Sequence, residues 1–190
     1  QISTPVPLPP APLPDIGGNG GTRPSPRPNG ELLFADDFAG DGAAPRARFG
    51  EQFMRFVTGN GQGELAGTYN GVLPVMYAIP PLADFYAEFD FQAPASQIDS
   101  AYGLIFRGDD TAGGLDAYYA LRLDTGDAQA SLNAWKDGVW ASKQGFELPN
   151  GLLVLDGSNH VRVEAVGSEF RVFANGELAF AVIDTTLPDP

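Results

Sequence analysis

The chain alternates regularly between apolar and polar side chains over residues 84–92, which read Asp84-Phe85-Tyr86-Ala87-Glu88-Phe89-Asp90-Phe91-Gln92. In an extended strand, successive side chains point to opposite faces, so the phenylalanines and Ala87 share one face and the polar side chains share the other. A strand with one apolar face buries that face against a second layer. The stretch therefore predicts a half-buried β-strand in a layered fold.

Further short strands follow at intervals of roughly ten residues, with turn signals between them. Asn175-Gly176 is the clearest hairpin turn. No window places apolar residues at helical spacing over three turns, and the one helical turn that we expect lies at residues 81–85. We predict an all-β sandwich or barrel with strands at 32–38, 52–58, 64–70, 72–77, 84–92, 101–107, 117–124, 129–135, 139–146, 160–166, 170–174 and 177–183.

Three segments carry a family resemblance: Ala101-Tyr102-Gly103-Leu104-Ile105-Phe106-Arg107, then Tyr118-Tyr119-Ala120-Leu121-Arg122-Leu123, then residues 160–166 leading to Phe170-Arg171-Val172-Phe173-Ala174-Asn175-Gly176. In this order they resemble the concanavalin A-like and laminin G-like superfamily, over about residues 32–187. The resemblance implies a two-sheet antiparallel jelly-roll sandwich whose first and last strands lie close together. It leaves function open, because the superfamily includes lectins, glycosidases, adhesion modules and structural domains.

The chain divides into an extended proline- and glycine-rich arm at residues 1–30 and a β-sandwich domain at residues 31–190. The arm alone cannot bury enough apolar surface to offset its ordering entropy, so we expect a spacer. The net charge of the whole chain is -13. An acidic surface disfavours nucleic acid and anionic lipid as partners. Solubility explains this acidity, and cation binding is the alternative.

The chain has no cysteine, which excludes disulfides and thiolate chemistry. No hydrophobic run approaches the roughly 20 residues of a membrane helix, so we expect no membrane insertion. The chain begins with Gln1 and not with Met. We therefore expect a secreted protein, extracellular or at the cell surface, after removal of a signal peptide; a trimmed chain is the alternative.

Proline alternates with apolar side chains over residues 5–9. Because proline has no N–H, one edge of this extended stretch has almost no donors, and the arm can pair with a sheet on its other edge only. The first predicted function is a non-enzymatic surface or filament subunit that self-assembles with copies of itself by donor-strand addition. A stiff tether is the alternative interpretation of the arm. The predicted pairing residues are Ile2, Thr4, Val6 and Leu8.

Trp135 and Trp140 flank a predicted turn and can face each other as a cross-strand pair. Aromatic rings stack on sugar faces, and polar side chains bond the sugar hydroxyls. Tyr118 and Tyr119 point to opposite faces, so only one of them can join such a site. Stabilisation of the hairpin is the structural alternative. The second predicted function is a carbohydrate-binding, lectin-like module for polysaccharide, with candidate residues Tyr118, Arg122, Asn133, Trp135, Trp140, Glu88 and Asp90.

Aspartates gather in predicted loops and at strand ends, and oxygen ligands on loops suit Ca²⁺. The resemblance adds weight to this hypothesis, because laminin G-like relatives often bind calcium at a sandwich edge. The alternative is that these aspartates bond the backbone of turns. The predicted functions require no cofactor, and the candidate calcium ligands are Asp109, Asp110, Asp116, Asp36 and Asp184.

Residues 88–92 are similar to the catalytic signature of sandwich-fold β-glucanases, in which two glutamates act as nucleophile and acid/base. The last position here is Gln92, which cannot donate a proton as an acid. The single histidine, His160, is expected to be exposed at a strand start, and no Gly-x-Ser-x-Gly surrounds any serine. We predict that the protein is not an enzyme; a degenerate glycosidase is the weakest alternative.

Deletion of residues 1–14 is expected to abolish assembly, because it removes the segment predicted to pair with a neighbouring sheet. Electron micrographs of the intact and truncated proteins would test this. Large particles from the intact protein alone support assembly through the arm, and equally monomeric proteins exclude it.

Overall fold

The computed structural model describes residues 82–92, 94, 101–111 and 114–187, together with the backbone of four short strands. These strands are β1 (Arg46–Ala47), β2 (Met54–Gly59), β3 (Gln62–Gly67) and β4 (Val75–Met76). Strand β1 pairs with β4, and β2 pairs with β3, both antiparallel. The predicted strand at 32–38 lies outside the described residues, as do Asp36 and the arm residues Ile2, Thr4, Val6 and Leu8.

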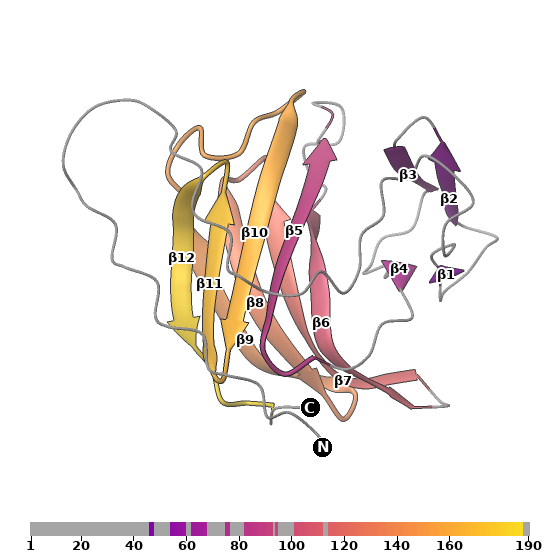
Figure 1. Cartoon of the computed structure of the whole chain (residues 1–190), viewed down its shortest axis with the longest axis vertical. Helices are drawn as coiled ribbons and strands as arrows, with labels where there is room; N and C mark the ends of the chain where they lie inside the picture. The colour runs from indigo at the N-terminus through magenta and orange to yellow at the C-terminus, as the bar shows by residue number, and fades with distance from the viewer. Residues whose placement is uncertain are drawn as a thin grey trace, which may run out of the picture.

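Two four-stranded antiparallel sheets form the layers of a sandwich, one in the order β12-β11-β10-β5 and the other in the order β6-β7-β8-β9 (Figure 1). The described residues contain no helix, so the predicted all-β sandwich is confirmed. The helical turn expected at 81–85 is wrong where it is described, because residues 83 and 84 bend and β5 begins at Phe85. The strands are β5 (Phe85–Gln92), β6 (Ala101–Thr111), β7 (Gly114–Asp124), β8 (Gln129–Lys136), β9 (Val139–Glu147), β10 (Ser158–Val166), β11 (Glu169–Ala174) and β12 (Glu177–Ile183).

Two tight turns have the backbone conformation that suits antiparallel hairpins. Asn175 and Gly176 join β11 to β12 with φ of 51° and 87°. Asp137 and Gly138 join β8 to β9 with φ of 50° and 80°. Two successive residues at positive φ match the right-handed twist of the flanking strands, and Asn, Asp and Gly accept this conformation at the least cost. The hairpin predicted at Asn175-Gly176 is confirmed.

The core lies between the two sheets. Tyr119 of β7 is fully buried and its ring packs on Phe170 of β11, with ring centroids 4.9 Å apart. At another point Phe146 of β9 stacks on Phe180 of β12, with centroids 3.9 Å apart and an angle of 6° between the rings. Each such side chain contributes about 1.5–3 kcal/mol when it leaves water. These contacts hold the two sheets face to face.

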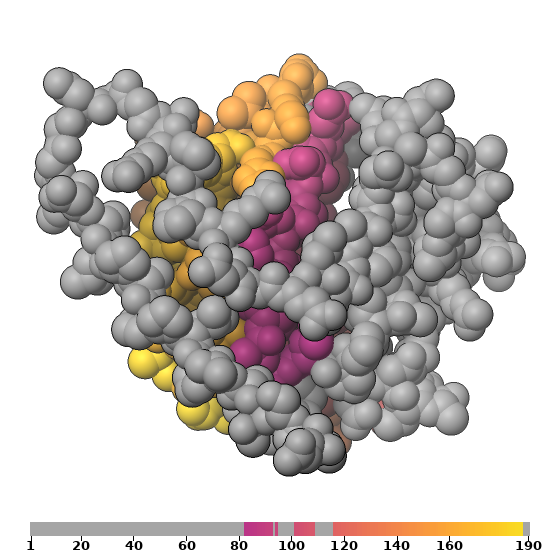
Figure 2. All heavy atoms as spheres, in the orientation of Figure 1, coloured from indigo at the N-terminus to yellow at the C-terminus, as the bar shows by residue number. Residues whose placement is uncertain are grey.

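Strand β5 joins the sheet of the C-terminal strands, although the four strands that follow it in sequence form the other sheet. It pairs antiparallel with β10 from Ala165 opposite Phe85 to Ser158 opposite Gln92. Figure 2 shows the atoms of β5 lying directly against those of the C-terminal strands. This crossover brings together side chains that are about seventy residues apart in the sequence, such as Asp90 and His160.

A buried carboxylate fastens one sheet to the other. Asp184, which follows β12, keeps only 6% of its surface exposed. Ser142 and Gln144 of β9 donate hydrogen bonds to its Oδ2 atom, at 2.8 and 2.6 Å. The Tyr119 hydroxyl donates to Oδ1 at 3.1 Å and accepts a hydrogen bond from the Leu187 amide, also at 3.1 Å. We call this arrangement the Asp184 clasp.

The hydrogen bonds of the clasp stabilise the ionised form of Asp184. Burial by itself raises the pKa of this carboxyl group, but the bonds from Thr186, Ser142 and Gln144 outweigh burial and lower the pKa from 3.8 to about 2. Burial and the neighbouring carboxylate raise the pKa of Tyr119 to about 12, so its hydroxyl stays a donor. A carboxyl group with a lowered pKa stabilises the fold above its unfolded pKa, and this contribution disappears as pH falls through about 2.

Replacement of Asp184 by asparagine is expected to reduce the free energy of unfolding at pH 7 by about 2 kcal/mol, which corresponds to the lowered pKa. The loss should shrink between pH 4 and pH 2, because the parent protein loses the same contribution there. Urea unfolding at several pH values measures both effects. Asp127→Asn, at an exposed turn position, is the matched control, and equal stability of Asp184→Asn and the parent at pH 7 would contradict the role of the clasp.

Candidate functional site

Three aromatic side chains form a row across the outer face of the β6–β9 sheet. In the strand register Tyr118 of β7 lies opposite Trp135 of β8, and Trp135 lies opposite Trp140 of β9. The ring centroids of Trp135 and Trp140 are 5.1 Å apart, and Tyr118 lies 6.2 and 6.0 Å from them. We call this row the aromatic rung. The predicted cross-strand pairing of the two tryptophans is confirmed.

Alternation along β7 explains why this rung faces outward. Tyr119 is fully buried in the core, so Tyr118 next to it points to the other side of the sheet, as predicted. On β9, Ser142 and Gln144 face inward to Asp184, and simple alternation would turn Trp140 inward with them. A register shift between Ala134 and Trp135 interrupts the alternation and sets Trp140 opposite Trp135. This irregularity completes the aromatic rung.

The next two rows on the same face combine small and polar residues. Ala120, Asn133 and Lys143 form the first of them in the register of β7, β8 and β9. The second row consists of Arg122, Ser131 and Gly145. Nothing lies within 4 Å of the place where a Cβ atom on Gly145 would stand. The face therefore has one row of three rings and, beside it, two rows that hold the cationic side chains of Lys143 and Arg122 and open space at Gly145.

The polar atoms of the rung remain available to a ligand. Among the described residues, neither the two indole N–H groups nor the Tyr118 hydroxyl donates a hydrogen bond to a protein acceptor. Burial raises the pKa of Tyr118, so its hydroxyl keeps its proton at neutral pH. An apolar ring face with an unused donor at its edge suits a ligand that has both C–H faces and hydroxyl groups.

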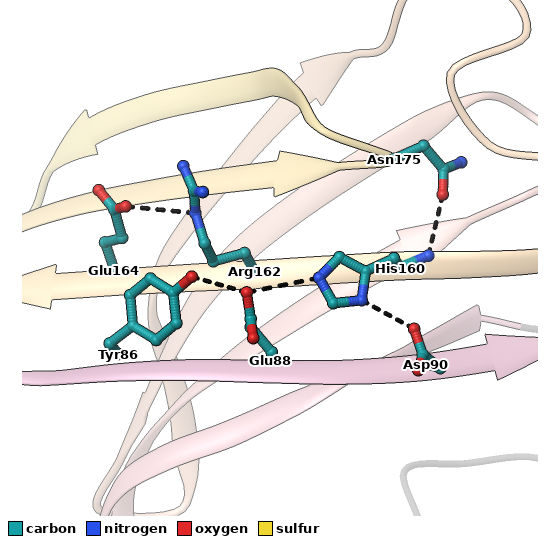
Figure 3. Close-up of polar contacts among 7 residues, drawn as sticks. All are labelled: Tyr86, Glu88, Asp90, His160, Arg162, Glu164 and Asn175. Atoms are coloured by element: carbon teal, nitrogen blue, oxygen red, sulfur yellow. Dashed lines mark hydrogen bonds and ion pairs between the residues drawn. The ribbon is translucent and has the colours of Figure 1, made fainter. Parts of the chain in front are cut away.

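A polar cluster lies on the outer face of the β12-β11-β10-β5 sheet, where β5 pairs with β10 (Figure 3). The imidazole of His160 lies between two carboxylates, with Nδ1 2.8 Å from Asp90 and Nε2 3.5 Å from Glu88. The Tyr86 hydroxyl donates to Glu88 at 2.6 Å. Burial and this hydrogen bond raise the pKa of Tyr86 to about 12. His160 is half exposed, but it takes part in a network that sequence reasoning missed, because only the β5–β10 pairing creates it.

Beside this cluster an arginine is enclosed by rings. The Arg162 guanidinium lies 3.7 Å from the ring centroid of Phe173 and 5.7 Å from that of Tyr86. Its Nε atom is 3.2 Å from the carboxylate of Glu164. Such cation–π contacts contribute about 2 kcal/mol when they are shielded from water. Arg162 thus supports the packing of this face.

The structure separates the predicted carbohydrate residues into two groups. Tyr118, Arg122, Asn133, Trp135 and Trp140 come together on the outer face of the β6–β9 sheet. Glu88 and Asp90 lie on the outer face of the other sheet, across the core, and do not reach the aromatic rung. Both carboxylates contact His160, and Gln92 at the end of the glucanase-like stretch pairs with Ser158. Lys143 and Ser131 join the first group and were not predicted; the strand register was the missing signal.

The predicted calcium ligands do not form one cluster among the described side chains. Asp184 lies in the clasp, where protein donors occupy both carboxylate oxygens. Asp116 lies exposed on β7, and Asp109 and Asp110 belong to β6, but their side chains lie outside the described part, as does Asp36. In the described part, no group of three His, Cys, Asp or Glu side chains could hold a metal ion. Calcium binding stays a prediction.

Two solved structures match just over half of this chain. The carbohydrate-binding module CBM66 from Bacillus subtilis matches 56% of this chain and 62% of its own length, with 20% sequence identity and a TM-score of 0.46. Sheep galectin-11, solved with glycerol, matches 56% of this chain and 75% of its own, with 16% identity and a TM-score of 0.42. This chain thus covers less than two thirds of the bacterial module. No protein-family model matches the sequence, and no curated protein matches it significantly.

The edge-to-face packing of Trp135 and Trp140 is expected to give an exciton couplet in the far-ultraviolet circular dichroism spectrum, because two indoles at this separation couple electronically. Trp140→Phe should remove the couplet and leave the β-sheet signal intact. A parent protein without a couplet, or a couplet that persists in Trp140→Phe, would contradict the geometry of the rung.

Proposed function

We propose that this protein is a non-catalytic carbohydrate-binding module that holds a glycan on the outer face of the β6–β9 sheet. The observation that carries the proposal is the aromatic rung, three rings from three neighbouring strands on a face that packs against no described layer. Rings of this kind stack on the C–H faces of sugars, and polar side chains beside them fix the orientation of the hydroxyl groups.

The composition of the neighbouring rows supports the proposal. A cross-strand tryptophan pair needs only its own contacts to stabilise a hairpin, at up to about 1 kcal/mol. It does not need unused donors at its edge or small residues beside it. Here Gly145, in the second row from the rings, leaves open space on the face, and Asn133 and Ser131 place polar side chains in the two rows beside the rings. These features favour a ligand site over a purely structural pair.

The cluster of Glu88, Asp90 and His160 supports catalysis less well. Glycoside hydrolysis needs one carboxylic acid that can protonate the leaving oxygen and a second carboxylate beside it. Both carboxylates here contact the same imidazole, and the third position of the motif is an amide. We therefore keep the non-enzymatic interpretation within the proposal, together with an extracellular or cell-surface location.

Self-assembly through the N-terminal arm stays a separate prediction, because its residues lie outside the described part. The two functions use different parts of the chain and are compatible. If the glycan site is on the β6–β9 sheet, deletion of residues 1–14 leaves glycan binding unchanged. This makes the two hypotheses distinguishable with one truncated protein.

Replacement of Trp140 by alanine is expected to weaken glycan binding about tenfold or more, since the loss of about 1.4 kcal/mol of stacking is tenfold in affinity. A glycan array identifies bound sugars, and calorimetry then compares the variants. Gly145→Val should also weaken binding, because its side chain would fill open space on the face without meeting protein atoms.

The matched control is Val139→Ala, which removes an exposed apolar side chain from the same hairpin. It should bind as the parent does, and circular dichroism should show all variants folded. Folded Trp140→Ala and Gly145→Val proteins that both retain full glycan affinity would refute the proposed site.

A further inference from the structure

We infer that the glycan held on this face is weakly acidic, with single carboxylate groups separated by neutral sugars. A polysaccharide with uronic acid residues spaced along a neutral backbone is such a glycan. This inference rests on the proposed function, and it names the class of sugar. The chain as a whole has a net charge of -13, yet the two rows beside the aromatic rung contain cationic side chains and no carboxylate.

The first support comes from the balance of donors and acceptors. The Asn133 side-chain amide donates to the Ser131 hydroxyl oxygen at 3.0 Å, so the hydroxyl proton of Ser131 is left to bind a ligand. Lys143 and Arg122 are donors only. The side-chain acceptors of these two rows are the Asn133 carbonyl oxygen and the remaining lone pair of the Ser131 hydroxyl, and neither carries a charge. A donor-rich surface suits a group that only accepts hydrogen bonds, and a carboxylate is such a group.

The second support is that both cations are available. Lys143 is exposed and makes no ion pair within the described part of the chain. The Arg122 side chain is 58% exposed, and its guanidinium is 3.9 Å from Asp124, a long contact in water that holds it weakly. Lys143 and Arg122 stand on opposite sides of Asn133 and Ser131, on β9 and β7. A carboxylate between them would meet positive charge from two strands.

The third support limits how densely the ligand is charged. The row that follows Arg122 consists of Asp124, Gln129 and Glu147. On the other side of the aromatic rung, Asp116 lies two residues before Tyr118 on β7. Carboxylates therefore lie directly beyond the cationic rows on one side and beyond the aromatic rung on the other. A polyanion with a charge on every sugar would place some charges against them and would be repelled, whereas a chain with spaced charges avoids this.

The experiment compares three soluble glycans by calorimetry. The first is a glucuronoxylan, which carries glucuronate at intervals along a neutral backbone. The second is the same polymer after its carboxyl groups have been reduced to alcohols. The third is polygalacturonate, in which every sugar is charged. The parent protein is expected to bind the first about tenfold more tightly than the second, and the third most weakly, with the preference falling as salt is added.

Two variants test whether the preference for the acidic polymer arises on the outer face of the β6–β9 sheet. Lys143→Gln and Arg122→Gln are each expected to reduce the preference for the acidic over the reduced polymer severalfold, because each removes a positive charge that would attract the carboxylate. Lys136→Gln, which removes the other lysine of the same hairpin from the opposite side of β8, should leave the preference unchanged. Trp140→Ala should weaken the binding of both polymers.

The outcomes separate this inference from the proposed function. Equal or tighter binding of the reduced polymer, abolished by Trp140→Ala, would refute the acidic ligand and leave the glycan site standing. If polygalacturonate bound most tightly, the inference that the ligand's carboxylates are spaced apart would be refuted. Absence of binding to any glycan, here and on the array, would overturn both proposals. A preference retained in both Lys143→Gln and Arg122→Gln would refute the role assigned to these cations.

Discussion

Each sheet buries one apolar face against the other sheet, and the orientation of the outward-facing side chains follows from this burial. Side chains along a strand alternate between faces, so a residue that points into the core places its two chain neighbours on the outer face of the sheet. Tyr119 packs on Phe170 in the core and thereby fixes Tyr118 on the outer face. The aromatic rung is thus a direct consequence of how the core is packed.

The Asp184 clasp adds polar bonds to this apolar contact. It joins the end of β12 to β7 and β9, the same two strands that carry Tyr118 and Trp140 on their outer faces. Since Ser142 and Gln144 are held inward by the buried carboxylate, the register of β9 is set close to the bulge that turns Trp140 outward. The inner face of β9 therefore stabilises the geometry of the candidate site on its outer face.

Much of the fold could be predicted from local patterns. The alternation over residues 84–92 identified β5, and Asn175-Gly176 identified the last hairpin, because these signals depend only on neighbouring residues. The opposite orientation of Tyr118 and Tyr119 followed from the same rule. The contact of His160 with Glu88 and Asp90 could not be predicted, because it depends on the pairing of β5 with a strand about seventy residues away. Many registers of two distant strands satisfy the same alternation, and the packing of the whole core selects one of them.

Period-two alternation and turn chemistry are local properties of the chain, so the amino-acid sequence is enough to indicate the strands, their turns and the presence of aromatic residues near Arg122 and Asn133. Which of these residues share a surface depends on the pairing of strands, some of which lie far apart in the sequence. This pairing separates Glu88 and Asp90 from the aromatic rung by placing β5 in the opposite sheet. It also brings Trp140 to the side of Lys143, because the bulge in the β8–β9 ladder reverses the alternation between them, and a bulge is fixed by hydrogen bonding and packing between strands rather than by the residues of one strand.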